Sequence, residues 1–407
     1  MNKSRRIKDG ILNGLTWLST AVAVAVLLLV FIFMVRRGWS DLSWDLISTD
    51  YWPQNLNVAF RQSEAGEYSA PADLAAGDSF STRYGFALRD ATDAQNATTL
   101  LITYVDPDSP LESAYVTTAG SQQGMNQAIH EDASVQMLYY QDAAGNQVIA
   151  GLLAGDDAAS LVQKLDSEAV SIQSMYYQTA GGGIRGSILA TLLLIGLTLL
   201  IVLPVGILAA VYLNEVASRN RLTAMLRQAI ETLNGVPSII FGLSGVVMLF
   251  PVTQLFGASG QSILLGALTM AVILLPVVIR QTEEALIVVP QILRMGSLAL
   301  GATRSQTIFK VVLPNALPGI LTATLLSVSR VIGESAALIY TMSTVVTDNP
   351  KILQPATSLA VQIWQIMSSE QPDFKLASAV SLIILFMVLL LNLTVKLITR
   401  RLSRRWA

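Results

Sequence analysis

Long stretches of this chain contain no ionisable side chain, and this feature constrains its fold more than any other. Residues 11–35 and 187–213 are uncharged, and each stretch exceeds the roughly 20 residues that cross the core of a bilayer. No charge occurs between Glu231 and Arg280, which leaves room for two more spans. With residues 317–342 and 376–395, the chain is predicted to be a polytopic membrane protein with six helical spans.

The first stretch is predicted to stay in the mature protein as a membrane span. It is longer than the apolar core of a signal peptide, and Arg36 and Arg37 follow it where a cleavage site would have small residues.

Basic residues predict the orientation of the spans, because cytoplasmic loops carry an excess of Lys and Arg. They occur at the N-terminus, at the C-terminus, after the second span and after the fourth: Lys3, Arg5, Arg6, Lys8, Arg400, Arg401, Arg404, Arg405, Arg219, Arg221, Arg227, Arg294, Arg304 and Lys310. Six spans place all four groups on one side, so both termini are predicted to be cytoplasmic. Arg36 and Arg37 alone disagree.

The segment between the first two spans differs in composition and is predicted to lie outside the membrane. Residues 40–180 contain 19 Asp and Glu against four Lys and Arg, whereas the rest of the chain has 22 basic and nine acidic residues. Strands are expected at residues 98–105, 134–140 and 147–153, with a hairpin turn from Asp142, and a more helical segment at 160–175. We therefore expect an α+β domain inserted on the extracytoplasmic side.

Several function classes are excluded by what the sequence lacks. The chain has no cysteine and a single histidine, His130, so thiol chemistry and a histidine-based metal site are not expected. The glycines at 181–183 lack the GxxxxGK[ST] spacing of a phosphate-cradling loop, and no such motif occurs elsewhere. The chain is not predicted to hydrolyse ATP or to bind a cofactor.

The segment from Gly296 to Ile320 is predicted to be a docking surface. Apolar residues recur in it at near-helical spacing, Gly301 interrupts it, and Pro314 and Pro318 are expected to bound its far end. This pattern predicts two short helices with an elbow near Gly301. A simple connection between helices needs only a few residues, whereas the fourth and fifth predicted spans are about 30 residues apart, which indicates a further role.

At this segment the chain resembles the permease subunits of ABC importers. Gly301, nine residues, then Val311-x-Leu313-Pro314 is similar to their EAA loop, although Met295-Gly296-Ser297 stands where that loop begins Glu-Ala-Ala. LNGVPSIIFGL, TEEALIVVPQILR, GGGIRGSILATLLL and SRVIGESAAL make residues 181–398 similar to the permeases of phosphate importers. The 40–180 insertion lies outside this resemblance.

The resemblance implies a type I importer permease in a bacterial inner membrane, with three regions: residues 1–39, the periplasmic domain 40–180, and a core 181–407 with five spans and a cytoplasmic coupling loop at about 283–314. It also implies a second permease subunit, an ATPase dimer that uses ATP, a periplasmic phosphate-binding protein and inorganic phosphate as cargo. No nucleic acid is expected as a partner. The predicted contacts with the ATPase are Gly301, Ala302, Val311, Leu313 and Pro314.

Arg330 and Glu334 are ionisable residues within the predicted fifth span, where charge is costly and often marks a transport path. Residues four apart share a helix face, so both are expected to face the interior of the bundle. One hypothesis is an anion site, in which Arg330 binds phosphate oxygens and Glu334 holds the guanidinium when phosphate is absent. The alternative is a structural ion pair.

Three further residues are predicted to line the substrate path. Asn234 and Ser238 flank the break that Gly235 and Pro237 make in a hydrophobic span, and either a cavity or a simple kink accounts for that break. Arg280, expected at the end of span four, is either the cytoplasmic exit contact or an interfacial anchor.

Other functions remain possible on sequence alone. A sulfate, molybdate or tungstate permease would need a similar anion site. A membrane sensor would use residues 40–180 as its ligand-binding domain, but no cytoplasmic signalling domain is evident. A secondary transporter is disfavoured because inverted repeats are not visible.

Overall fold

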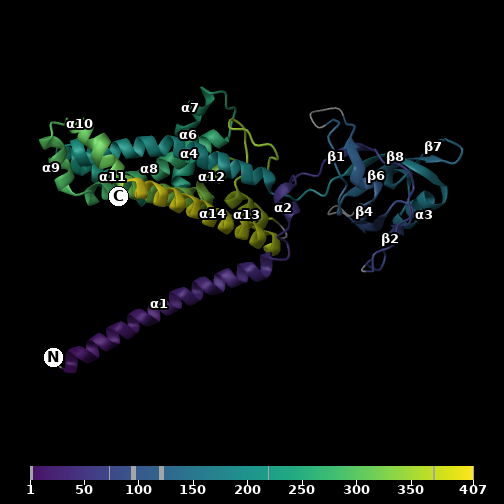
Figure 1. Ribbon diagram of the computed structural model, residues 1–407, viewed down its shortest axis with the longest axis horizontal. Coiled ribbons are helices and arrows are strands. Elements are labelled where there is room, and N and C mark those ends of the chain that lie inside the picture. Colours follow the sequence, from purple (N-terminus) through teal and green to yellow (C-terminus); the bar gives the residue numbers. More distant parts are fainter. Residues whose placement is uncertain are drawn as a thin grey trace. The chain divides into compact units, whose positions relative to one another are not determined.

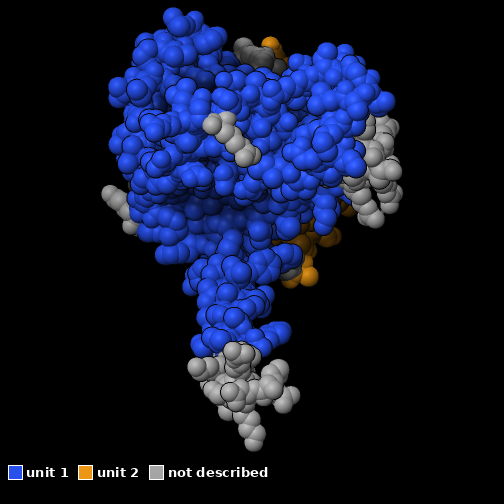
Figure 2. All heavy atoms as spheres, turned by 90° about the vertical axis from the view of Figure 1, so that its left-hand side faces the viewer, with its two compact units in different colours: residues 1–51, 183–407 blue, residues 52–182 orange. Residues whose placement is uncertain are grey.

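The computed structural model describes residues 3–406 apart from 73, 93–97, 119–122, 219, 370 and 371, and describes side chains within residues 12–397. The chain forms two compact units (Figures 1 and 2): unit 1 is Met1–Tyr51 with Gly183–Ala407, and unit 2 is Trp52–Gly182. Arg219 and the basic side chains of both termini, which were used to predict orientation, lie outside the described residues.

All regular secondary structure in the described part of unit 1 is helical. Its helices are α1 (Lys3–Gly38), α2 (Trp44–Ser48), α4 (Arg185–Val211), α5 (Arg221–Asn234), α6 (Ser238–Met248), α7 (Phe250–Gln254), α8 (Ile263–Val288), α9 (Gln291–Ala299), α10 (Arg304–Thr307), α11 (Leu313–Gly333), α12 (Ala336–Thr341), α13 (Leu359–Met367) and α14 (Phe374–Trp406). Two π-helical turns, η3 (Tyr212–Val216) and η4 (Ile308–Val312), follow α4 and α10.

Five described helices are long and apolar enough to cross a membrane, and a sixth span exists only if α5 and α6 count as one. Those two helices are bent by 107° at a break, where Gly235 and Pro237 interrupt the backbone hydrogen bonds. With 11 residues, α6 is about 16 Å long, which is shorter than the roughly 30 Å hydrocarbon core. The sequence predicted the break but not this size of bend.

Two helix boundaries differ from prediction. The fifth span does not run to Met342, because α11 ends at Gly333 and α12 begins at Ala336. Pro314 and Pro318 do not end a short helix but lie within α11. Pro314 occupies one of the first two helical positions, where the missing N–H costs little, and the wider turn η4 precedes it.

The centre of unit 1 is α8, which packs against α4 and α11 (Figure 1). A close approach supports this packing: a Cβ added to Gly206 of α4 would meet Cγ1 of Val278 on α8 at 2.6 Å. Buried apolar side chains from α4, α8, α11 and α12 form one continuous core. This core brings together helices far apart in sequence and places the break between α11 and α12 beside them.

Unit 2 is an antiparallel sheet with one helix. The strands are β1 (Asn55–Phe60), β2 (Ser79–Ser81), β3 (Phe86–Thr92), β4 (Thr98–Val105), β5 (Ala114–Val116), β6 (Ser134–Asp142), β7 (Gln147–Ala150) and β8 (Ala169–Gln178), and the helix is α3 (Ala158–Glu168). Their order is β2-β3-β4-β6-β8-β1-β5, with β7 paired to β6. Leu88, Ile102, Leu138 and Leu161 belong to its core.

The strand predictions for this unit are confirmed at β4 and β6, whereas the strand predicted at residues 147–153 ends early, because β7 stops at Ala150 and a 3-10 turn follows at Leu152–Ala154. Asp142 forms the expected hairpin turn by accepting from the Ala144 and Asn146 N–H groups. The helical prediction for residues 160–175 is wrong in its second half. The helix ends at Glu168, and β8 follows because these residues pair with both β6 and β1. Residues before Trp52 belong to unit 1, where Leu46 of α2 is buried with Ile184 and Val380.

Candidate functional site

The predicted pair Arg330 and Glu334 lies at a helix break. Gly333 ends α11, and Glu334 has extended backbone angles, φ −79° and ψ 124°. Its Oε1 accepts a hydrogen bond from the Ala337 N–H over 3.2 Å, so the carboxylate caps the start of α12. The expectation that both residues share one helix face is therefore wrong, because Glu334 is not helical.

Arg330 occupies the last turn of α11, and its side chain is exposed. A cation in this position is favoured by the partial negative charge of the free carbonyl groups at a helix C-terminus. Among the described residues, none of the ion pairs includes Arg330. The structural ion pair with Glu334 that the sequence left open is thus not formed in this structure, and the role of Arg330 in transport stays a prediction.

The break between α11 and α12 is packed against the second predicted path segment. A Cβ added to Gly242 of α6 would meet the Cα of Ala337 at 2.7 Å and its carbonyl oxygen at 2.9 Å. Ser238 begins α6 and is half-buried, whereas Asn234 ends α5 and is exposed. The structure packs α6, which begins at Ser238, against α12, whose start Glu334 caps, and Asn234 lies across the bend at the end of α5.

The break between α5 and α6 and the break between α11 and α12 therefore lie on either side of one close contact between α6 and α12. Irregular backbone at membrane depth is tolerated where it is buried in protein or lines a water-filled cavity. Gly333 has no atom within 4 Å of an added Cβ, so its lack of a side chain serves no packing contact in this chain. Beside Gly333 and Arg330, a ligand or another chain can approach the backbone closely.

Arg280 does not end its span, because α8 continues to Val288. Its guanidinium lies 3.4 Å from Glu231 of α5 and 3.4 Å from Glu284 one turn further along α8. All three side chains are half or more exposed, and such pairs contribute at most about 1 kcal/mol. This arrangement fits an anchor, and it leaves the exit contact as a prediction.

The predicted docking segment has the expected elbow. Gly301 lies between α9 and α10 with φ +86°, a left-handed conformation that glycine adopts without steric cost. Thr303 then caps α10 in a reciprocal arrangement with Gln306. Ala302, Val311, Leu313 and Pro314 are half-buried, and Gly301 is exposed, so the elbow is accessible for contact with another chain.

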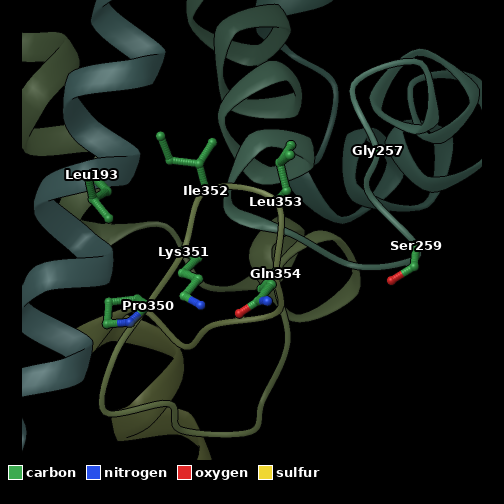
Figure 3. A pocket seen from close by; sticks show the side chains of 8 residues that line it. All are labelled: Leu193, Gly257, Ser259, Pro350, Lys351, Ile352, Leu353 and Gln354. Carbon is green, nitrogen blue, oxygen red and sulfur yellow. The ribbon is translucent and has the colours of Figure 1, made fainter. Parts of the chain in front are cut away.

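A pocket of about 700 Å³ in unit 1 is lined by α4, by the loop before α8 and by the loop between α12 and α13. Lys351 and Gln354 extend from the loop between α12 and α13, with Leu193 of α4 on one side and Ser259 on the other (Figure 3). No sequence pattern singles out Lys351, a lone lysine in a polar loop. The only signal at Glu215 is that it is the first carboxylate after a long uncharged stretch.

Five described helices that are long and apolar enough to cross a membrane are the mark of an integral membrane protein, and the exposed elbow at Gly301 gives it a surface for another chain. Residues 202–407 match the model of the binding-protein-dependent transport system inner membrane component family, and the chain belongs to this family. It is an inner-membrane ABC permease subunit of the PstA-like kind rather than a catalytic subunit.

Proteins similar to this chain are named as transporter permeases. The chain is 35% identical over 232 residues to the probable ABC transporter permease protein YqgI of Bacillus subtilis, covering 53% of this chain and 78% of that protein. It is 34% identical over 230 residues to the phosphate transport system permease protein PstA of Pasteurella multocida, covering 55% and 80%. A chain of the MetNI methionine ABC transporter, solved in inward-facing conformations, matches with TM-score 0.43 and 24% identity, covering 54% and 95%.

Proposed function

We propose that this chain is the permease subunit of an ATP-driven importer of inorganic phosphate and forms half of its translocation pore. Its partners are a PstC-like second permease, a PstB-like ATPase dimer and a PstS-like periplasmic phosphate-binding protein. ATP is bound and hydrolysed by the ATPase, and this chain binds no cofactor. Both termini are cytoplasmic, and residues 40–180, which include all but the last two residues of unit 2, lie in the periplasm.

The single observation that carries the cargo assignment is the exposed guanidinium of Arg330 beside a helix break. Arg330 lies 12 residues after Pro318 within α11, or about 18 Å along the helix axis. A guanidinium donates two parallel hydrogen bonds to phosphate oxygens. PstA relatives with about 34% identity support the same cargo.

Glu334 has a proposed role beside Arg330. The carboxylate caps α12, so its negative charge stays at the break and competes with phosphate for the guanidinium. Ser238 and Asn234 offer neutral hydrogen-bond groups from the facing segment, and Arg280 is the exit contact. Release of phosphate then follows from a movement that brings Glu334 closer to Arg330.

Unit 2 carries 16 Asp and Glu against four Lys and Arg. This charge repels free phosphate within a Debye length, about 8 Å at physiological salt. Delivery inside a binding protein avoids that repulsion, which supports the periplasmic partner.

The ATPase contacts the elbow through Gly301, Ala302, Val311, Leu313 and Pro314, and ATP turnover moves α9 and α10.

Phosphate uptake by the assembled importer tests this function, with variants compared at matched expression and with sulfate and molybdate as competitors. We expect Arg330→Ala to reduce uptake at least tenfold, because the anion loses its charged donor. Arg330→Lys should retain part of the uptake, since it keeps the charge but not the planar fork. Glu334→Gln removes the charge that competes with phosphate but keeps an oxygen for the α12 cap. This variant should therefore show a higher apparent phosphate affinity and a slower turnover.

Each outcome has a defined meaning. If sulfate or molybdate blocks uptake by the wild type, the cargo is a different anion. Uptake that survives Arg330→Ala in an assembled complex removes Arg330 from the path. Unchanged kinetics in Glu334→Gln assign Glu334 to capping alone.

A further inference from the structure

An ion pair joins the end of α4 to the segment that we propose contacts the ATPase. Arg294 of α9 donates from Nη2 to Oε1 of Glu215 over 2.7 Å and from Nε to Oε2 over 3.3 Å. This is the bidentate geometry of the strongest charge-assisted hydrogen bonds. The two side chains are only 12% and 11% exposed. Glu215 lies in the π-helical turn η3, and Asn214 also donates to its Oε1 over 2.9 Å.

The same pair holds two further segments. Arg294 donates to the carbonyl oxygens of Leu286 over 2.8 Å and Val289 over 2.5 Å, where α8 ends. Arg304 of α10 donates to the carbonyl oxygen of Glu215. One guanidinium and one glutamate therefore connect the ends of α4 and α8 with the helices on both sides of the elbow.

The two sides of α9 differ in their contacts. Arg294 and Ser297 are half-buried, and Ser297 Oγ lies 2.9 Å from Thr307 Oγ1 of α10. Ile292 and Met295 are 72% and 62% exposed. The inner side of α9 is thus fixed to the rest of unit 1, while its outer side presents apolar residues.

We propose that Glu215 and Arg294 are positioning residues that form a latch and transmit movement of the α9–α10 segment to α4. The inference rests on the proposed function, in which the ATPase acts on this segment. Moving α9 away from α4 would separate Arg294 from Glu215 and leave two buried charges without their ion-pair partners, which is strongly unfavourable. The helices therefore move together, and a displacement at the elbow becomes a displacement of α4, which packs against the central helix α8.

The test measures ATP hydrolysis and phosphate transport by the assembled importer in proteoliposomes. We expect Arg294→Ala to leave ATP hydrolysis within twofold of wild type and to lower the phosphate transported per ATP at least tenfold. Arg294→Lys should fall between wild type and Arg294→Ala, because the ammonium keeps the positive charge but not the bidentate geometry. Arg221→Ala, at the exposed start of α5, is the matched control and should leave this ratio unchanged.

A rescue experiment separates the latch from a simple effect on folding. The chain has no cysteine, so Glu215→Cys combined with Arg294→Cys gives a unique pair of thiols in this subunit. A short thiol-bridging reagent should restore at least half of the lost transport per ATP, and each single cysteine variant should not respond.

The outcomes distinguish this inference from the function on which it rests. If Arg294→Ala and Arg294→Lys both transport as much phosphate per ATP as wild type, the latch proposal is wrong and the importer assignment is unaffected. Bridging that restores nothing also overturns it. If wild type hydrolyses no ATP with its partners or moves no phosphate, the proposed function itself fails.

Discussion

Individual residues show where sequence spacing predicts a site and where it does not. Ionisable residues are rare within apolar stretches that cross a membrane, and this rarity singled out Arg330 and Glu334. Both lie at the break between α11 and α12, and their role in the substrate path stays a prediction. Their four-residue spacing predicted a shared helix face, and this prediction is wrong because Glu334 lies outside α11. Glu334 accepts from the Ala337 N–H, and this bond is available only because the helix breaks after Gly333. A local spacing rule assumes a continuous helix, and nothing in the spacing reports a break.

The Glu215–Arg294 pair could not be predicted for a different reason. The two residues are 79 positions apart, and only the packing of α4, α8 and α9 brings them together. Each residue alone looked like a charge at a membrane interface. Long-range ion pairs depend on tertiary arrangement, so sequence patterns of helical or strand period do not contain them.

A pH-dependent contribution to stability is expected in unit 2. Arg89 Nε lies 2.5 Å from Asp78 Oδ1, and the Asp78 side chain is 4% exposed. This hydrogen bond holds the pKa of Asp78 below its ordinary value of 3.8. Because the folded pKa is depressed, the stabilisation is present above pH 3.8 and is lost as pH falls through the folded pKa.

Amide hydrogen exchange of β2 and β3 in the full chain, corrected for intrinsic rates, measures this effect. Asp78→Asn should be less protected than wild type at pH 6, and the difference should shrink as pH falls below 3.8. A difference that stays constant down to pH 3 would show that the Asp78 charge contributes nothing.

At the scale of whole elements, the length of a hydrophobic stretch predicted that a helix forms there, but the sequence did not predict where each helix ends. The uncharged stretches became α1, α4, α8 and α14 because a bilayer core requires about 20 apolar residues. The ends of α5, α6 and α11 depend on a bend, a cap and a π-helical turn. The elbow at Gly301 was predictable because glycine is the residue that readily adopts its positive φ.

The contact between α6 and α12 yields a prediction about Gly242. An added Cβ would meet backbone atoms of Ala337, and backbone cannot move aside as a flexible side chain can. Gly242→Ala should therefore lower the stability of the assembled complex by about 1–3 kcal/mol, as overpacking does, and should reduce uptake.

Gly196 of α4 is the matched control, because an added Cβ there meets nothing within 4 Å and alanine favours a helix over glycine by about 1 kcal/mol. Thermal unfolding of the purified complex compares the two variants. Equal midpoints for Gly242→Ala and Gly196→Ala would mean that α6 does not pack on α12 through this glycine.

At the scale of the whole molecule, the two units have separate cores. The core of unit 2 is built only from residues within Trp52–Gly182, and the three cores of unit 1 contain none of them. The composition of residues 40–180 indicated a separate body, because its charge and polarity differ from the rest of the chain. Where that body begins depends on α2, whose Leu46 is buried in unit 1.

Removal of unit 2 is therefore expected to leave unit 1 folded. The Ile184 N–H donates to Leu46 O over 2.8 Å and the Gly183 N–H donates to Asp50 O over 3.1 Å, so the two ends of the excised segment already lie together. Replacing residues 52–182 with a linker of about three glycine and serine residues should preserve assembly with the partner subunits, measured by copurification and thermal unfolding. The ion pair of Asp50 with Arg185 holds this junction, so Arg185→Ala should destabilise the excised chain more than Arg221→Ala does.

An excised chain that aggregates or loses its partners would show that unit 1 depends on unit 2 for its fold. If the excised chain assembles but phosphate uptake is lost, unit 2 acts in receiving the cargo rather than in building the permease.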